Sequence, residues 1–156
     1  MNLRLTIDGT AVETLIDPGE SLMALLRRLG HTSVKNGCDH GDCGSCAVLI
    51  DGRAVTACLV FAAQMDGATI TTIEGLEGPG GLHPLQFTAL DEGAVQCGFC
   101  TPGMLLAALD LLGANPDPTE AEVRRALAGS YCRCTGYVKP VAAILAAAAV
   151  MRESRS

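Results

Sequence analysis

The chain has few basic residues: 11 lysines and arginines stand against 17 acidic residues, which gives a net charge of −6 over 156 residues. The basic residues are scattered, so the sequence lacks the positive patch that a nucleic-acid-binding protein presents to phosphates. Its only membrane-like stretch, residues 141–150, is far shorter than the ~20 apolar residues of a spanning helix. We therefore expect no nucleic-acid partner and no membrane span.

Signals for export and for catalysis are also missing. Residues 1–9 alternate apolar and polar side chains as a strand does, and they lack the apolar run of a signal peptide. We expect a cytoplasmic protein. The sequence contains no nucleotide-binding glycine fingerprint and no proton-transfer constellation, so we expect no catalytic residue in this chain. Substrate chemistry would then take place on another chain.

Cysteine, in contrast, is abundant, with eight residues. A secreted disulfide framework is disfavoured because no export signal is seen and a reducing cytosol keeps thiols free. Metal binding explains the cysteines better. They form two groups of four, which are Cys38, Cys43, Cys46 and Cys58 in the first half and Cys97, Cys100, Cys132 and Cys134 in the second.

The first group has the spacing Cys-x4-Cys-x2-Cys-x11-Cys. This spacing is typical of plant-type ferredoxins, in which four thiolates hold a [2Fe–2S] cluster. The loop that carries the first three cysteines also contains Gly37, Gly41 and Gly44. Glycine allows the positive φ angles and the close backbone approach that wrapping a cluster requires.

The second group lies at two predicted helix starts. Cys97 and Cys100 precede Thr101-Pro102, a cap residue followed by the proline that suits a first helical turn. A Cys-x2-Cys pair can hold one metal ion from a single turn. Cys132 and Cys134 precede Thr135-Gly136 and, at Pro140, the last helix. Both helix starts would direct free backbone N–H groups toward one anionic centre.

Periodicity predicts an α+β fold. Alternating residues 3–7 and 12–16 flank the Asp8-Gly9 turn and predict a hairpin, and leucines at helical spacing predict a helix over 21–29. Strands are expected at 47–50, 53–59 and 68–73.

Glycine and proline dominate residues 76–83, which we interpret as a linker between a domain at 1–75 and a helical domain at 84–156. We expect helices there over 84–92, 101–112 and 123–128 and from Pro140 onward, with a capping box at Thr119 and Glu122.

Three motifs, in order, are Gly-Cys-x4-Cys-Gly-x-Cys, Gln-Cys-Gly-Phe-Cys-Thr-Pro-Gly and Cys-Arg-Cys-Thr-Gly-Tyr. With them the chain resembles, over residues 2–150, the iron–sulfur subunit of the xanthine dehydrogenase and aldehyde oxidase family, the molybdenum hydroxylases. The resemblance implies an N-terminal ferredoxin-like β-grasp domain, a C-terminal four-helix bundle, and one [2Fe–2S] cluster in each. One departure is Ser45-Cys46-Ala47, where the family usually has Ala-Cys-Thr.

The resemblance also implies a route and partners. Electrons would come from a molybdopterin cofactor on a large subunit, pass the helical-domain cluster and then the ferredoxin-domain cluster, and reach FAD on a medium subunit or an external acceptor. Gln96 and Cys134 would contact the pterin. The assembly would be a heterotrimer or a dimer of heterotrimers.

Other interpretations of the same residues exist. Two cysteine quartets could be two zinc sites, although the x4 and x1 spacings count against zinc. Cys38 and His40 invite a Rieske interpretation, but neither His31 nor His83 follows a cysteine as that motif requires. Gln96 could be a plain helix-packing residue. The chain could also be a free-standing two-cluster ferredoxin that meets its partners transiently.

Overall fold

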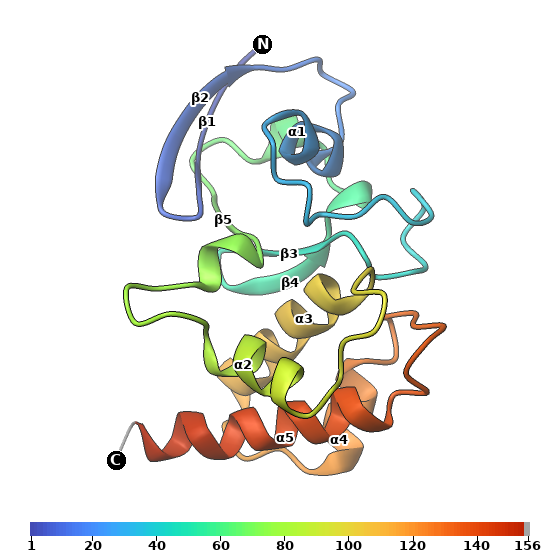
Figure 1. Ribbon diagram of the computed structural model, residues 1–156. Coiled ribbons are helices and arrows are strands. Elements are labelled where there is room, and N and C mark those ends of the chain that lie inside the picture. The colour runs from blue at the N-terminus through green and yellow to red at the C-terminus, as the bar shows by residue number, and fades with distance from the viewer. Residues whose placement is uncertain (155–156) are drawn as a thin grey trace.

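The computed structural model describes residues 1–154. The chain folds into two halves (Figure 1). The first half contains a five-stranded mixed sheet and one helix, and the second contains four helices, so the fold class is α+β as predicted. Each half has its own cluster of buried apolar residues. No helix among the described residues is long and apolar enough to cross a membrane.

The sheet has the strand order β2-β1-β5-β3-β4, in which β1 and β5 are parallel and the other neighbours antiparallel. The predicted hairpin is present, because Asp8 and Gly9 both take positive φ angles of 49° and 78° between β1 and β2. Such angles give the tight turn that matches strand twist. The strands are β1 (Asn2–Ile7), β2 (Thr10–Leu15), β3 (Ala47–Ile50), β4 (Arg53–Thr56) and β5 (Thr69–Thr71).

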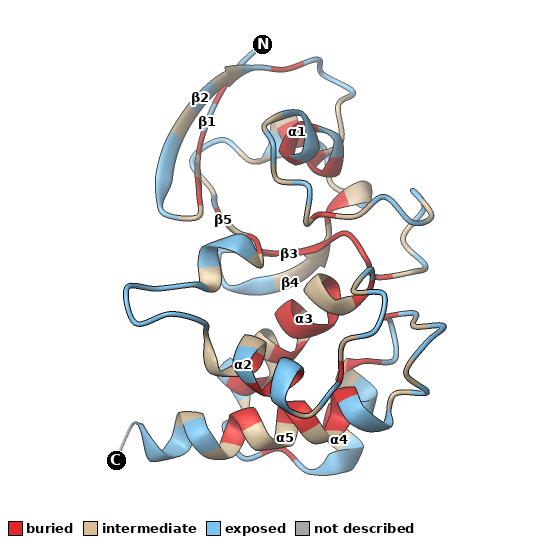
Figure 2. Cartoon of the chain, in the orientation of Figure 1, coloured by how far each residue is buried: buried red, intermediate tan, exposed pale blue. Residues whose placement is uncertain are grey.

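Helix α1 (Leu22–Arg28) packs its apolar face onto the sheet half. The Ser21 hydroxyl caps it by accepting a hydrogen bond from the backbone N–H of Ala24 at 3.2 Å. Leu22, Leu25 and Leu26 are completely buried, and they join the core with residues of β1 and β3. The red stretches of α1 and β3 in Figure 2 mark this core.

The second half is built from helices α2 (Pro84–Asp91), α3 (Thr101–Ala114), α4 (Glu120–Ala126) and α5 (Val138–Glu153). These helices surround a core that includes Leu85, Leu105, Val123 and Ile144. The capping box predicted for α4 is confirmed: Thr119 Oγ1 accepts from the backbone N–H of Glu122 at 3.3 Å, and the Glu122 carboxylate accepts from the Thr119 N–H at 2.7 Å.

Several boundaries differ from the sequence expectation. Cys100, not Thr101, occupies the N-cap of α3, and that helix continues past Gly113 to Ala114. Helix α5 begins at Val138, two residues before Pro140, after Tyr137 takes a left-handed φ of 66°. The segment 57–59, expected as strand, is a short 3₁₀ turn. This turn places Cys58 beside Cys46 of the cysteine loop.

The two halves meet where α3 packs against β3 and β4. Asp110 of α3 accepts a hydrogen bond from the Ala54 N–H at 3.1 Å and lies 3.1 Å from the Arg53 guanidinium. Figure 1 shows α3 lying directly below these strands, while the segment after the short turn Glu74–Leu76 loops outward at the side. Residues 77–82 of this connection are exposed.

Two candidate metal centres

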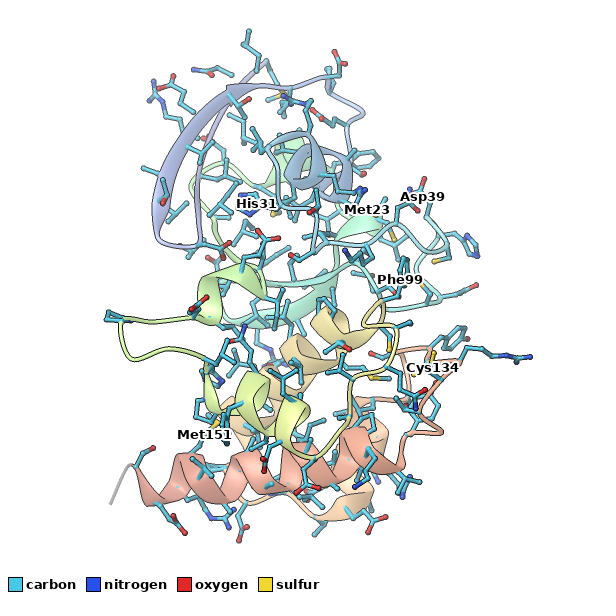
Figure 3. All side chains as sticks on the ribbon, in the orientation of Figure 1. Met23, His31, Asp39, Phe99, Cys134 and Met151 are labelled. Carbon is cyan, nitrogen blue, oxygen red and sulfur yellow. The ribbon has the colours of Figure 1, made fainter. Side chains whose placement is uncertain are left out.

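All eight cysteines are free thiols; Cys58 lies in the short 3₁₀ turn at 57–59, and the others lie in loops or at helix ends. Figure 3 shows Asp39, Phe99 and Cys134 along one edge of the molecule, where the sulfur atoms gather. The structure brings each predicted quartet together from segments that are distant in sequence. Segments 38–46 and 57–59 supply one quartet, and segments 97–100 and 132–134 supply the other.

In the first quartet the thiols lie in pairs. Cys38 lies beside Cys43, whose backbone N–H points at the Cys38 sulfur at 3.5 Å. Cys46 lies beside Cys58. Backbone N–H groups, first that of His40 and then that of Cys43, lower the pKa of Cys38 to about 6. Burial raises the pKa of Cys46 to about 11, so this sulfur ionises readily only on a metal ion.

The loop around this quartet leaves no room for side chains at two glycines. A Cβ at Gly37 would lie 2.8 Å from the Cys43 sulfur. Gly41 has a φ of +91°, and its Cβ would lie 2.5 Å from a methyl carbon of Leu59. At Gly37 the backbone therefore closes tightly around a sulfur, as the glycine-rich sequence predicts.

The second quartet also forms two pairs. The sulfurs of Cys97 and Cys134 are 3.6 Å apart, and Cys100 lies beside Cys132. Each pair therefore joins one cysteine from each loop, instead of two from the same Cys-x2-Cys turn. The reason is that the two loops face each other at the starts of α3 and α5, which places their cysteines opposite one another.

Burial varies across this second quartet. Cys97 and Cys134 are exposed, whereas Cys100 is buried, and burial raises the pKa of Cys100 to about 12. Burial also acts on Cys132, but hydrogen bonds from the hydroxyl and N–H of Thr135 outweigh it and lower the pKa of Cys132 to about 7. The hydroxyl oxygen of Thr135 is 3.1 Å from that sulfur.

The pairing favours a two-metal centre over a single ion. Four thiolates around one zinc at about 2.3 Å would bring every pair of sulfurs to about 3.8 Å. Over residues 1–154 no three cysteine sulfurs all lie within 4.8 Å of one another; the one set of metal-ligand side chains that close together is Asp8, His31 and Glu74. Two sulfur pairs for each quartet match two irons with two thiolates each. His40 does not belong to either sulfur pair. Its side chain is exposed, and its Nε2 lies 3.0 Å from the carboxylate of Asp42.

Gln96 lies next to the exposed sulfur pair. Its side-chain amide donates a hydrogen bond to the backbone carbonyl of Cys134 at 3.2 Å. The structure thus brings together the two residues for which the family resemblance implies a pterin contact, and both are exposed.

Sequence reasoning missed two residues that order the second quartet. Thr135 hydrogen-bonds the Cys132 sulfur, and the Tyr137 hydroxyl accepts the Cys132 N–H at 2.9 Å. Thr135 follows the Cys-x-Cys pair directly, and Tyr137 comes two residues later. A threonine three residues after a ligating cysteine could have been recognised, because its N–H and hydroxyl can turn back to the sulfur.

Comparison with known proteins agrees with two centres. The model of a 2Fe-2S iron–sulfur cluster binding domain matches residues 5–70, and that of a [2Fe-2S] binding domain matches residues 72–145. The small FeS subunit of nicotinate dehydrogenase from Eubacterium barkeri is 47% identical over 145 residues, which cover 92% of each chain. The iron–sulfur-binding subunit of xanthine dehydrogenase from Escherichia coli O157:H7 is 44% identical over 93% of this chain and 92% of that one. The chain belongs to the iron–sulfur subunits of the xanthine dehydrogenase and aldehyde oxidase family.

Solved structures of this family share the fold. Quinoline 2-oxidoreductase from Pseudomonas putida 86 aligns with a TM-score of 0.94 at 41% identity, over 100% of this chain and 98% of that one. Aldehyde oxidoreductase from Desulfovibrio desulfuricans aligns with a TM-score of 0.93 at 42% identity, and here the chain spans 97% of its own length and 17% of the other. In this iron–sulfur subunit two [2Fe–2S] clusters fit the two matched domains, and the chain is part of an oxidoreductase whose substrate chemistry lies on partner subunits.

Proposed function

We propose that this iron–sulfur subunit relays electrons from a molybdopterin centre on a large subunit to FAD or to an external acceptor. The bound [2Fe–2S] clusters would supply one-electron transfer at each site. The observation that carries the proposal is the division of eight thiols into two centres, each with two sulfur pairs, within one family member. The chain's own residues hold the clusters, set their spacing and exclude water from the inner sulfurs.

The proposed ligands are all eight cysteines. Cys38 and Cys43 would hold one iron of the ferredoxin-domain cluster, and Cys46 and Cys58 the other. In the helical domain the two irons would be held by the pairs Cys97–Cys134 and Cys100–Cys132. The adjacency of the thiols within each pair supports this division.

The helical-domain centre would face the molybdopterin through Gln96 and Cys134. A hydrogen bond holds the exposed residues Gln96 and Cys134 side by side, and Cys97 beside them is also exposed. An exposed sulfur pair suits contact with a cofactor on another chain, whereas the buried Cys100 on the inner side does not.

The proposed domain division is a ferredoxin-like β-grasp at 1–75, a linker at 76–83 and a four-helix bundle at 84–156. Two separate buried clusters support it, since one contains residues of the sheet and α1 and the other residues of α2 to α5. The exposed connection after the turn Glu74–Leu76 supports the linker.

The proposed assembly is a heterotrimer or a dimer of heterotrimers with a large molybdopterin-binding subunit and a medium FAD-binding subunit. Several relatives bear the names of small or iron–sulfur-binding subunits, which supports obligatory partners. We place the assembly in the cytoplasm, because a reducing compartment keeps the eight thiols available for iron.

Replacing Cys97 by serine in the purified complex tests the route. The exposed Cys97–Cys134 pair is lost, so the helical-domain EPR signal should disappear and substrate should no longer reduce the flavin. The ferredoxin-domain signal should remain. Arg133→Lys is the matched control, because it keeps the charge between Cys132 and Cys134 and should keep both signals. Flavin reduction at the normal rate in the Cys97→Ser complex contradicts the route, and a chain that purifies without larger subunits favours a free-standing carrier.

A further inference from the structure

Three metal-ligand side chains from separate segments meet away from the cysteines. They are Asp8 in the turn between β1 and β2, His31 in the segment after α1, and Glu74 at the start of the connection between the halves. The Nδ1 of His31 lies 3.0 Å from Oε2 of Glu74 and 3.5 Å from Oδ2 of Asp8. All three ligand atoms lie within 4.8 Å of one another. Figure 3 shows His31 apart from the edge that carries Asp39 and Cys134.

Neighbouring groups hold both carboxylates in place. Asp8 accepts hydrogen bonds from the backbone N–H and from the hydroxyl of Thr72, both at 2.7 Å. Glu74 accepts the Ser33 N–H on Oε1 at 3.0 Å, which leaves Oε2 facing His31. Outer hydrogen bonds of this kind orient the ligands of metal sites. The carboxylate oxygens are therefore aimed at one point before any ion binds.

A buried hydroxyl beside this cluster lacks a partner. The Ser33 Oγ is the one buried side-chain oxygen or nitrogen of residues 1–154 that has no hydrogen-bond partner. Burial opposes the ionisation of Glu74, but the hydroxyl and the N–H of Ser33, and then His31, outweigh it and lower the pKa of Glu74. The Ser33 oxygen thus lies near the carboxylate without completing a hydrogen bond to it. Such a hydroxyl can bind an ion, or a water molecule that an ion carries.

We propose that Asp8, His31 and Glu74 bind one Zn²⁺ or a similar transition-metal ion, with water or the Ser33 hydroxyl as the fourth ligand. Two carboxylates and a neutral imidazole carry a charge of −2, which one divalent cation balances. An imidazole ligand favours Zn²⁺ over Mg²⁺ and Ca²⁺, which prefer oxygen. Around a tetrahedral zinc with bonds of about 2.0–2.1 Å, donor atoms lie about 3.4 Å apart. The distances of 3.0 and 3.5 Å are close to this value.

A protonated His31 between the two carboxylates is the competing interpretation. An imidazolium could donate from Nδ1 toward both oxygens, but its single positive charge would leave the half-buried cluster with a net charge of −1. It would also leave the Ser33 hydroxyl as it is, without a partner. A divalent ion balances the charge and offers the hydroxyl a ligand position, which favours metal binding.

A bound ion would fasten three segments of the first half. These are the β1–β2 turn, the segment after α1 and the turn Glu74–Leu76, from which the exposed connection leaves. We expect Zn²⁺ to slow hydrogen exchange of the backbone amides in this turn, because opening it would break a metal bond. The site uses no cysteine, so this inference does not depend on the proposed function.

Zinc binding is measured on the complete chain with both iron–sulfur clusters in place, so that the cysteines are occupied. Calorimetric titration with Zn²⁺ should show one saturable site per chain, with the iron content unchanged. The zinc K-edge X-ray absorption spectrum then identifies the ligands. We expect nitrogen and oxygen neighbours at about 2.0–2.2 Å and no sulfur at about 2.3 Å.

Matched variants locate the ion. His31→Gln and Glu74→Gln each remove one ligand and should abolish the saturable site. His40→Gln, which changes an exposed histidine beside another carboxylate, and Glu77→Gln, an exposed position in the same connection, should bind Zn²⁺ as the wild type does. Thr72→Val removes the hydroxyl behind one carboxylate and should weaken binding about 10- to 100-fold.

A wild-type chain without a saturable zinc site overturns the proposal, and so does a His31→Gln chain that binds Zn²⁺ as tightly as the wild type. Sulfur neighbours in the absorption spectrum would place the zinc on the cysteines and reject this site. A chain that lacks iron but binds one zinc through nitrogen and oxygen supports the inference while the proposed function fails, so the two failures are distinguishable.

Discussion

Helix α2 should lose stability at mildly acidic pH because a neutral histidine caps it. His83 occupies the N-cap, and its Nδ1 accepts a hydrogen bond from the Leu85 N–H at 3.2 Å. The Gln86 side chain accepts from the His83 N–H at 2.9 Å and donates to the Ile73 carbonyl at 3.1 Å, which fastens the helix start to the first half of the chain. A protonated Nδ1 cannot accept a hydrogen bond.

The direction of the effect follows from the pKa. Burial lowers the pKa of His83 below its ordinary value of 6.5, so the folded state resists a proton that the unfolded state binds. The stabilisation is complete above pH 6.5 and is lost as the pH falls from there toward the lower folded-state pKa. Losing an N-cap costs about 1 kcal/mol, or about fivefold in the opening equilibrium of the helix.

Hydrogen exchange of the α2 amides, corrected for intrinsic rates, measures this opening at about pH 7.5 and pH 5.5, on either side of the ordinary histidine pKa. We expect about fivefold greater opening at the lower pH in the wild type. His83→Asn keeps a capping acceptor without a titrating group, so its opening should change little with pH. Equal pH dependence in the two proteins refutes the role of His83.

Two further predictions concern packing. Leu85→Ala should lower the free energy of unfolding by about 2–5 kcal/mol, because Leu85 is completely buried. Leu90→Ala, on the exposed side of α2, should change this free energy by less than about 0.5 kcal/mol. Equal losses for the two variants in chemical denaturation would contradict the assigned helix face. Gly41→Ala should lower the iron content of the first centre because its Cβ meets Leu59, and Gly52→Ala, with a similar φ of +84° but open space, should not. Equal iron contents in these two variants would show that only the φ angle matters.

Local patterns allowed much of the fold to be predicted. The Asp8-Gly9 turn, the leucine spacing of α1 and the Thr119–Glu122 capping box each depend on residues close in sequence, and all three are present. Helix ends were less predictable. Residues 138 and 139 precede Pro140 inside α5, because the left-handed Tyr137 starts the helix earlier than the proline suggests.

Contacts between distant loops could not be predicted from spacing. The Cys-x2-Cys spacing indicates that Cys97 and Cys100 can bind metal from one turn, but only the fold shows that each of them lies beside a cysteine from 132–134. The cap formed by His83 was also missed, since histidine is not a typical N-cap residue and only the fold shows its Nδ1 facing the Leu85 N–H. The ligand assignment of the eight cysteines stays a prediction.

Iron and acid-labile sulfide analysis of the purified chain, together with EPR of its reduced form, tests the central claim most directly. Two [2Fe–2S] clusters predict about four irons and four sulfides per chain and two distinguishable reduced-state signals. Zinc in place of iron, or a single signal from a chain that contains all eight cysteines, would contradict the account.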